Sequence, residues 1–374
     1  MANADLAITP GELNRATLAR QMLLERADVD ATTGVERLIG MQAQEARPPF
    51  IGLWSRLQGF ARDDAHRALH DRALVRATLM RGTIHLFSAD DYRAFRPAIQ
   101  PVLDGGLRVL GDKGSGLDIE RVLPVAQALL RESPLPFPAI RDHLQARFPE
   151  VNDRALGYTV RMLLPLVMMP TEHRWGYPAN AAFGLADDWL GASAPPPDAL
   201  QELVRRYLGA FGPATVTDAQ TWLGMTGLKP TFAALRPELV VFRGERNKEY
   251  FDLPHAPRPP ADTPAPVRFL PDFDNLLLSH ADRTRVIADD HRNIVYQKGN
   301  LRLLPSFLVD GVVAGTWRSE RKRKDATLTL TPFAPLPKRA QSELAEEGDR
   351  LLHFVEEDAA TFAVIFADPL QPKA

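Results

Sequence analysis

The sequence of 374 residues contains no cysteine and no long apolar run. The absence of cysteine excludes disulfide bonds, thiolate nucleophiles and zinc sites with cysteine ligands. The longest apolar segment, residues 162–169, is about half as long as the ~18 residues that a membrane-spanning helix needs. Residues 1–10 lack the basic and apolar pattern of a secretory signal. We therefore expect a cytoplasmic protein without a membrane partner.

Three common chemical motifs are also absent. The sequence has no GxxxxGKS/T phosphate loop, no GxGxxG dinucleotide motif and no HExxH zinc motif. Nucleotide hydrolysis, dinucleotide chemistry and zinc proteolysis are therefore unsupported, and we expect neither a metal nor a cofactor.

Neither sign of charge is in excess, because 45 basic and 47 acidic residues give a net charge of −2. On bulk charge alone, binding to nucleic acid is not expected. Only 8 of the 45 basic residues are lysine. Arginine suits bidentate contacts with phosphate, but a GC-rich coding bias produces the same excess. Locally, residues 283–324 carry ten basic and four acidic residues, whereas residues 325–374 carry four basic and nine acidic ones.

What the sequence does contain is a pattern of two or three helices followed by a hairpin, repeated three times. The first hairpin turns at Arg81 and Gly82, where glycine supplies the positive φ that a tight turn needs. Helices closed by a hairpin are typical of winged helices. We therefore predict an α+β protein with three tandem winged-helix motifs and a small C-terminal β-barrel. The predicted hairpins span residues 74–87, 166–185 and 239–253, and the predicted units span residues 1–115, 116–195, 196–255 and 267–374.

The third and fourth units are separated by residues 254–266, which contain six prolines and predict a stiff linker. Beyond it, short β-type runs punctuated by glycine are typical of a small barrel or sandwich. A helix is predicted over residues 338–355. The predicted strands are residues 267–270, 285–287, 293–296, 307–313, 326–330 and 362–366.

Two clusters offer catalytic groups of familiar kinds. Ser279, His280 and Asp282 include a nucleophile, a base and a carboxylate, but neighbours in sequence rarely converge into a triad. Asp272 and Asp274 would lie on one side of an extended strand, as paired glycosidase carboxylates can. Turn capping is the more common role for such a string. An isolated basic run, such as residues 321–324, is most often a solvated turn.

Gln42 and Gln44 form the most unusual polar pattern. Glutamines two residues apart point to one side of an extended segment but to different sides of a helix. Two neutral amides can hold a water molecule by donating and accepting hydrogen bonds, although they cannot strongly deprotonate it. Such a site suits a reaction whose leaving group is already good. Judged from the residues alone, a pair of glutamines on the surface is the more common explanation.

Ordered motifs along the chain carry a resemblance to a known family. They are residues 13–18 (LNRATL), 41–44 (MQAQ), 81–86 (RGTIHL), 270–275 (LPDFDN) and 280–285 (HADRTR). Together they resemble the bacterial winged-helix family of alkylpurine DNA glycosylases over nearly the whole chain. The Gln-x-Gln form is most similar to the azinomycin-resistance branch, which unhooks interstrand crosslinks, whereas the other branch has Gln-x-Asp.

The resemblance implies tandem winged helices with a C-terminal barrel, and it implies that Gln42 and Gln44 are catalytic. It further implies a monofunctional enzyme acting on double-stranded DNA with N7-alkylated purines. We expect a nucleoid-associated monomer. The alternative from another class is a non-catalytic winged-helix transcription regulator, which would need a dimerisation surface and a long recognition helix. The residues predicted to contact DNA are Arg81, His85, Arg243, Arg246, Lys248, His280, Arg283, Arg285, Arg321, Lys322 and Arg323.

Overall fold

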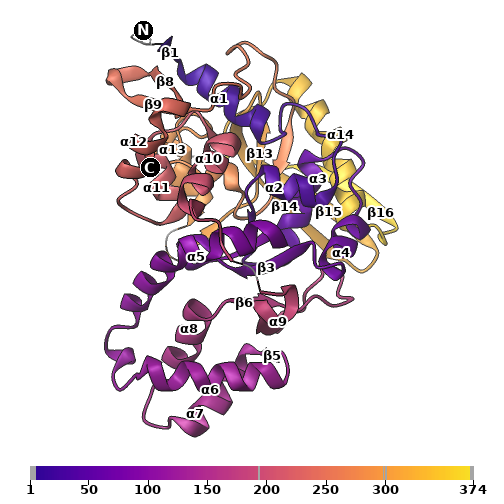
Figure 1. Ribbon diagram of the computed structural model, residues 1–374. Coiled ribbons are helices and arrows are strands. Elements are labelled where there is room, and N and C mark those ends of the chain that lie inside the picture. The colour runs from indigo at the N-terminus through magenta and orange to yellow at the C-terminus, as the bar shows by residue number, and fades with distance from the viewer. Residues whose placement is uncertain (1–5, 193, 298, 300, 371–374) are drawn as a thin grey trace.

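The computed structural model describes residues 6–192, 194–297, 299 and 301–370. Within these residues the chain forms a mixed structure of fourteen α-helices and several sheets, which confirms the predicted α+β class. In Figure 1, helices α6, α7 and α8 form a lower lobe, and the long helix α5 runs between this lobe and the rest of the molecule. No helix among the described residues is both long enough and apolar enough to cross a membrane.

The first unit contains the predicted hairpin. Its turn has positive φ at both central residues, 57° at Arg81 and 68° at Gly82, which is the geometry that a twisted two-residue hairpin favours. The elements are α1 (Pro10–Arg20), α2 (Ala31–Arg37), β2 (Met41–Gln42), α3 (Arg47–Arg56), α4 (Arg62–His70), β3 (Leu74–Thr78), β4 (Ile84–Ser88) and α5 (Ala89–Gly106).

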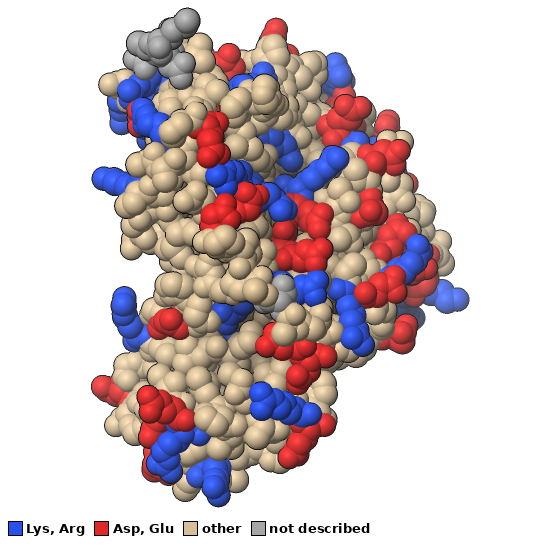
Figure 2. Space-filling model, in the orientation of Figure 1, with Lys and Arg blue, Asp and Glu red and all other residues tan. Residues whose placement is uncertain are grey.

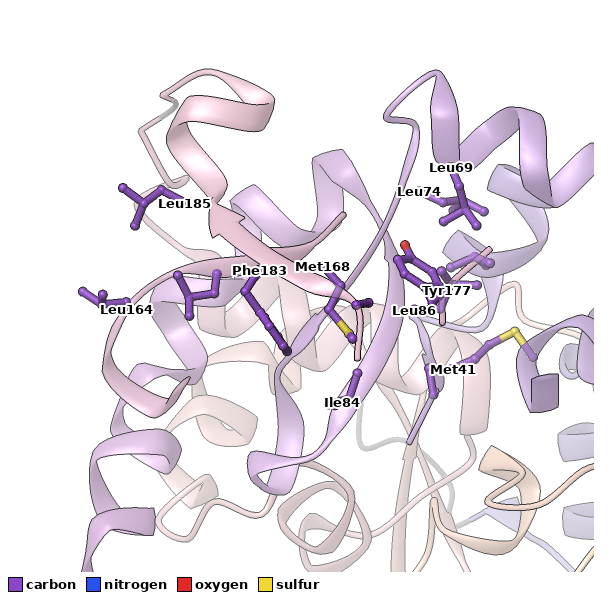
Figure 3. Packing of buried hydrophobic residues seen from close by; sticks show 14 of the residues in the cluster. Met41, Leu69, Leu74, Ile84, Leu86, Leu164, Met168, Tyr177, Phe183 and Leu185 are labelled. Atoms are coloured by element: carbon purple, nitrogen blue, oxygen red, sulfur yellow. The ribbon is translucent and has the colours of Figure 1, made fainter. Parts of the chain in front are cut away.

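The second unit shares its sheet with the first. Ala77 of β3 pairs with Val167 of β6, so six strands run in the order β2-β4-β3-β6-β7-β5. One hydrophobic cluster spans both hairpins, and Figure 3 shows Ile84 of the first hairpin near Met168 and Phe183 of the second. The additional elements are α6 (Ile119–Glu132), β5 (Leu135–Pro136), α7 (Phe137–Arg147), α8 (Asp153–Leu163), β6 (Leu166–Met168), β7 (Ala182–Leu185) and α9 (Ala186–Leu190).

The third predicted hairpin is also present, as strands β8 and β9. The beginning of the chain adds β1 to it as a parallel neighbour of β8, with Leu6 opposite Phe242. Strand β1 therefore lies beside this hairpin (Figure 1). The elements are β1 (Leu6–Ala7), α10 (Ala199–Phe211), α11 (Val216–Leu223), α12 (Lys229–Leu235), β8 (Val240–Arg243) and β9 (Glu249–Asp252).

The predicted C-terminal barrel is wrong, because the sheet in this unit is open. Its strands run in the order β10-β13-β14-β15-β16, and no pairing among the described residues joins the two outer strands. The last strand is parallel to its neighbour β15, so α14 crosses over and covers one face. The elements are β10 (Arg268–Leu270), α13 (Asp289–Val295), β11 (Tyr296–Gln297), β12 (Arg302–Leu303), β13 (Ser306–Val309), β14 (Val312–Lys322), β15 (Asp325–Pro332), α14 (Lys338–Val355) and β16 (Thr361–Phe366).

Three of the predicted strands in this unit are also wrong. Residues 307–313 are interrupted by the turn at Asp310 and Gly311 that joins β13 to β14. Residues 293–296 are mostly the end of helix α13, which begins with Asp289 and Asp290. Acidic residues in a first turn favour a helix because they interact with its positive end. Residues 285–287 form a turn rather than a strand. The predicted helix over residues 338–355 is confirmed as α14.

Candidate functional site

Gln42 lies on the two-residue edge strand β2 and pairs with His85 of β4. Its side chain is buried, and its Oε1 accepts a hydrogen bond from Nη2 of Arg81 at 2.9 Å. Its backbone amide donates to Oδ1 of Asn275 at 3.4 Å. Gly40, at φ +81°, brings this strand against Phe87; a Cβ there would lie 1.9 Å from the ring. The local sequence thus places an amide side chain tightly against the first hairpin.

Gln44 lies just beyond the strand and is exposed. Its Oε1 accepts a hydrogen bond from the backbone amide of Ile84 at 3.3 Å. The backbone of residues 43 and 44 is held by Arg76, whose guanidinium donates to the carbonyls of Ala43 and Gln44 at 2.9 and 3.0 Å. Gln42 and Gln44 therefore both bond to residues 81–84, and the amide oxygen of each accepts a hydrogen bond from this segment.

A cavity of about 10 Å³ lies beside Gln42. This volume is close to the minimum that holds one water molecule, and it is much smaller than a purine base. The lining residues are Leu38, Met41, Gln42, Pro48, Pro49, Arg56, Pro271, Asp272, Phe273, Asp274 and Asn275.

Arg81 and His85 complete the polar contacts of Gln42. Arg81 donates to the carbonyl of Trp222 and lies 3.4 Å from Nε2 of His85. Because arginine only donates, Nε2 must accept, so Nδ1 carries the proton and donates to the carbonyl of Thr83 at 3.0 Å. Burial and the charge of Arg81 lower the pKa of His85 to about 3, so the imidazole is neutral. Burial lowers the pKa of Arg81 to about 10, which leaves it charged at neutral pH.

The LPDFDN segment braces the strand that carries Gln42. Asp274 forms two hydrogen bonds with the guanidinium of Arg56 on α3, at 2.9 and 2.8 Å, and both side chains are buried. Nδ2 of Asn275 donates to the carbonyl of Gly40 at 2.6 Å, while its Oδ1 accepts from Gln42. Arg56 was not recognised from the sequence, and Asn275 was recognised only as part of the LPDFDN motif, because their partners lie more than 200 residues away.

The structure does not bring Asp272 and Asp274 together as a catalytic pair. Asp274 accepts from the backbone amide of Leu276 at 2.9 Å, which is the expected turn cap, and its other bonds go to Arg56. Asp272 lies 3.6 Å from Arg302. Burial and the nearby Glu45 raise the pKa of Asp272.

Ser279, His280 and Asp282 do not form a triad. Oγ of Ser279 and Nδ1 of His280 are 3.0 Å apart, but both side chains are buried and Nε2 of His280 contacts the carbonyl of Phe211 at 3.0 Å. Asp282 instead accepts from Thr284 at 2.6 Å. In this conformation His280 is unavailable to a ligand, and we leave it out of the proposed DNA-binding surface.

The other predicted DNA contacts fall at three places. Arg285 is buried and donates to the carbonyl of Pro213 at 3.2 Å, so we leave it out as well. Arg283 is partly exposed and stacks 4.5 Å from the ring centre of Tyr296. At the β14–β15 turn, Lys322 and Arg323 are exposed.

The β8–β9 hairpin carries Arg246 at its exposed tip. Arg243 lies 3.3 Å from Glu249, and Lys248 lies 3.2 Å from Asp282. Arg321 of the β14–β15 turn likewise pairs with Asp358, at 2.9 Å. Figure 2 shows basic and acidic side chains interspersed over the face it presents. The local excess of basic residues in the sequence is therefore partly compensated by acidic neighbours in space.

Two buried histidines make the stability depend on pH. Burial lowers the pKa of both His85 and His280 to about 3, against an ordinary value of 6.5. The unfolded chain binds their protons near pH 6.5 and the folded chain does not, so stability is complete above this value and falls as pH decreases toward 3. We expect a slope of at most about 3 kcal/mol per pH unit, because each of the two histidines takes up one proton on unfolding. Urea unfolding at pH 7, 6 and 5 measures this dependence of the free energy of unfolding on pH. The variant His280→Gln should show a smaller slope. Equal urea midpoints at pH 5 and 7 would contradict the prediction.

Comparisons with known proteins find relatives of this chain in sequence and in fold. The family described as DNA glycosylase AlkZ-like matches residues 35–354. An interstrand DNA cross-link repair glycosylase from Streptomyces sahachiroi is 26% identical over 337 residues, which cover 84% of this chain and 88% of that protein. The solved structure of Streptomyces sahachiroi DNA glycosylase AlkZ has a TM-score of 0.77 at 22% identity, covering 97% of this chain and all of that one.

Proposed function

Because this chain belongs to the AlkZ-like family of DNA glycosylases, we propose that it hydrolyses the N-glycosidic bond of N7-alkylated purines in double-stranded DNA, including purines joined in an interstrand crosslink. The crosslink substrate is supported by the relative from Streptomyces sahachiroi, whose name states that activity. Chromosomal DNA as substrate fits the expected nucleoid association. The alternative function was a non-catalytic transcription regulator, and membership of a glycosylase family argues against it.

The observation that carries the mechanism is that Gln42 and Gln44 both bond to residues 81–84. An N7-alkylated purine is cationic and leaves readily, so water needs orientation more than activation. The water oxygen bonds to C1′ as the bond between C1′ and N9 breaks. The electron pair of the broken bond neutralises the cationic purine, and the water loses a proton to solvent. The two amides hold the water and orient it toward the developing positive charge on the sugar.

The small cavity beside Gln42 favours an open mode of substrate binding. A base that is fully flipped from the duplex needs a pocket of its own size, and about 10 Å³ is far too little. A crosslinked purine remains tied to the opposite strand and cannot rotate freely. We propose that three winged-helix units surround the duplex, with the exposed tip at Arg246 and the turn at Lys322 and Arg323 contacting phosphates.

The test is base release by the full-length protein. A duplex with one N7-methylguanine should yield the free base and an abasic site, whereas the same duplex with unmodified guanine should yield neither. A nitrogen-mustard crosslink, followed on a denaturing gel, should be unhooked. Absence of release from both damaged duplexes would overturn the proposed function, and release from the methylated duplex alone would remove the crosslink from it.

A further inference from the structure

Arg81 is a partly buried cation without an acidic partner among the described residues. Its guanidinium contacts three neutral groups: the carbonyl of Trp222, Oε1 of Gln42 and Nε2 of His85. A charge removed from water usually requires a counter-ion. Burial accordingly lowers the pKa of Arg81, and the positive charge of Arg283 lowers it further. The folded protein therefore keeps the positive charge of Arg81 at a position where burial and a neighbouring cation disfavour it.

The backbone at Arg81 is also unfavourable for arginine. Its φ of 57° places it at the first central position of the hairpin turn, where asparagine or glycine is preferred. Arginine combines a strained backbone with an uncompensated charge here. Local rules broken at one residue are typical of functional positions.

The bond to Gln42 has a geometric consequence. A guanidinium only donates, so Gln42 must turn its oxygen toward Arg81. The planar amide then directs Nε2 away from Arg81, and its rotation is fixed. Without Arg81 the amide of Gln42 would be free to exchange its oxygen and nitrogen.

Arg81 is itself held by the third unit. The carbonyl of Trp222 lies in the last turn of α11, where the helix dipole favours a cation. Gly224 ends this helix at φ +74°, and a Cβ there would lie 3.0 Å from Cα of Arg81. Glycine thus allows the end of α11 to approach the hairpin turn closely enough to hold the guanidinium.

We propose that Arg81 is a positioning residue that fixes the orientation of the Gln42 amide for the hydrolysis, and that it does not bind a DNA phosphate. This inference rests on the proposed function of Gln42, and it replaces the predicted DNA contact of Arg81. It also assigns α11 of the third unit a part in ordering the hydrolytic site of the first.

The test is Arg81→Asn, because asparagine suits the positive φ and should preserve the fold. Under single-turnover conditions on the N7-methylguanine duplex, we expect the maximal rate to fall about 10- to 100-fold. The Kd for the duplex and its salt dependence should stay unchanged. Arg72→Asn is the matched control, since Arg72 also has positive φ (60°) and donates to a tryptophan carbonyl, that of Trp189, at 2.8 Å. It should leave the rate unchanged.

A double-mutant cycle separates positioning from other roles. If Arg81 acts through Gln42, adding Arg81→Asn to Gln42→Ala should slow the reaction no further. A multiplicative loss, or a salt slope reduced by about one charge as for a lost phosphate contact, would overturn the inference while leaving the proposed function intact. A Gln42→Ala protein as fast as the wild type would instead overturn the proposed role of Gln42, and with it this inference.

Discussion

Replacing Gln42 and Gln44 together with alanine should slow base release about 10³-fold while leaving the protein folded. Each single substitution is expected to slow the single-turnover rate by about 10²- to 10³-fold, the usual effect of removing one preorganised hydrogen-bonding group. If both amides hold the same water, the double variant should lose much less than the product of the two single losses. The lesion-containing duplex should still bind, because the phosphate contacts proposed for Arg246, Lys322 and Arg323 do not involve these glutamines.

A matched control exists for this experiment. Gln58 is exposed and lies outside the candidate site, so Gln58→Ala should keep the wild-type rate. Thermal unfolding of all variants would show that the fold is retained. Undiminished release by the double variant would rule out the amide mechanism, even if the wild-type protein proves to be a glycosylase.

The second large effect is expected at Asp274, whose removal should destabilise the protein by about 3–5 kcal/mol. Among the described residues, Asp274→Ala leaves the buried Arg56 guanidinium with only the carbonyl of Gly52 as a hydrogen-bond partner, at 3.1 Å. An uncompensated buried charge accounts for a loss of this size. The measurement is the free energy of unfolding in urea at neutral pH.

The control replaces both members of the pair. Arg56→Met combined with Asp274→Leu removes the charges and keeps most of the volume, so it should be considerably more stable than Asp274→Ala alone. If the single and double variants were equally unstable, lost packing rather than the unpaired charge would be responsible. An unchanged stability of Asp274→Ala would contradict the prediction outright.

Local patterns predicted local structure well. Strand-type runs on either side of the turn at Arg81 and Gly82 located the first hairpin, and the pattern of residues 338–355 located α14. Sheet closure was not predictable, because strand spacing contains no information about which outer strands meet. The open sheet follows from β16 joining in parallel through a helix, which no short motif indicates.

The candidate site was predictable only in part. Residues 41–44 and 81–86 were singled out by their sequence, and the structure places them in contact. The hydrogen bonds by which Asp274 and Asn275 hold α3 and the strand of Gln42 join residues more than 200 positions apart in the sequence. The local excess of basic residues was a poor guide to the charge of the surface for a similar reason. Pairs such as Arg321 with Asp358 form between segments that are distant in sequence.

The position of Gln42 on the edge strand β2 has a consequence for heat tolerance. This strand is two residues long, and its outer side is held by the side chain of Asn275 rather than by another strand. Segments with few backbone hydrogen bonds open at a lower free energy than the interior of a sheet. Inactivation on heating should therefore begin with the release of this short edge, at a temperature where the six-stranded sheet is still folded.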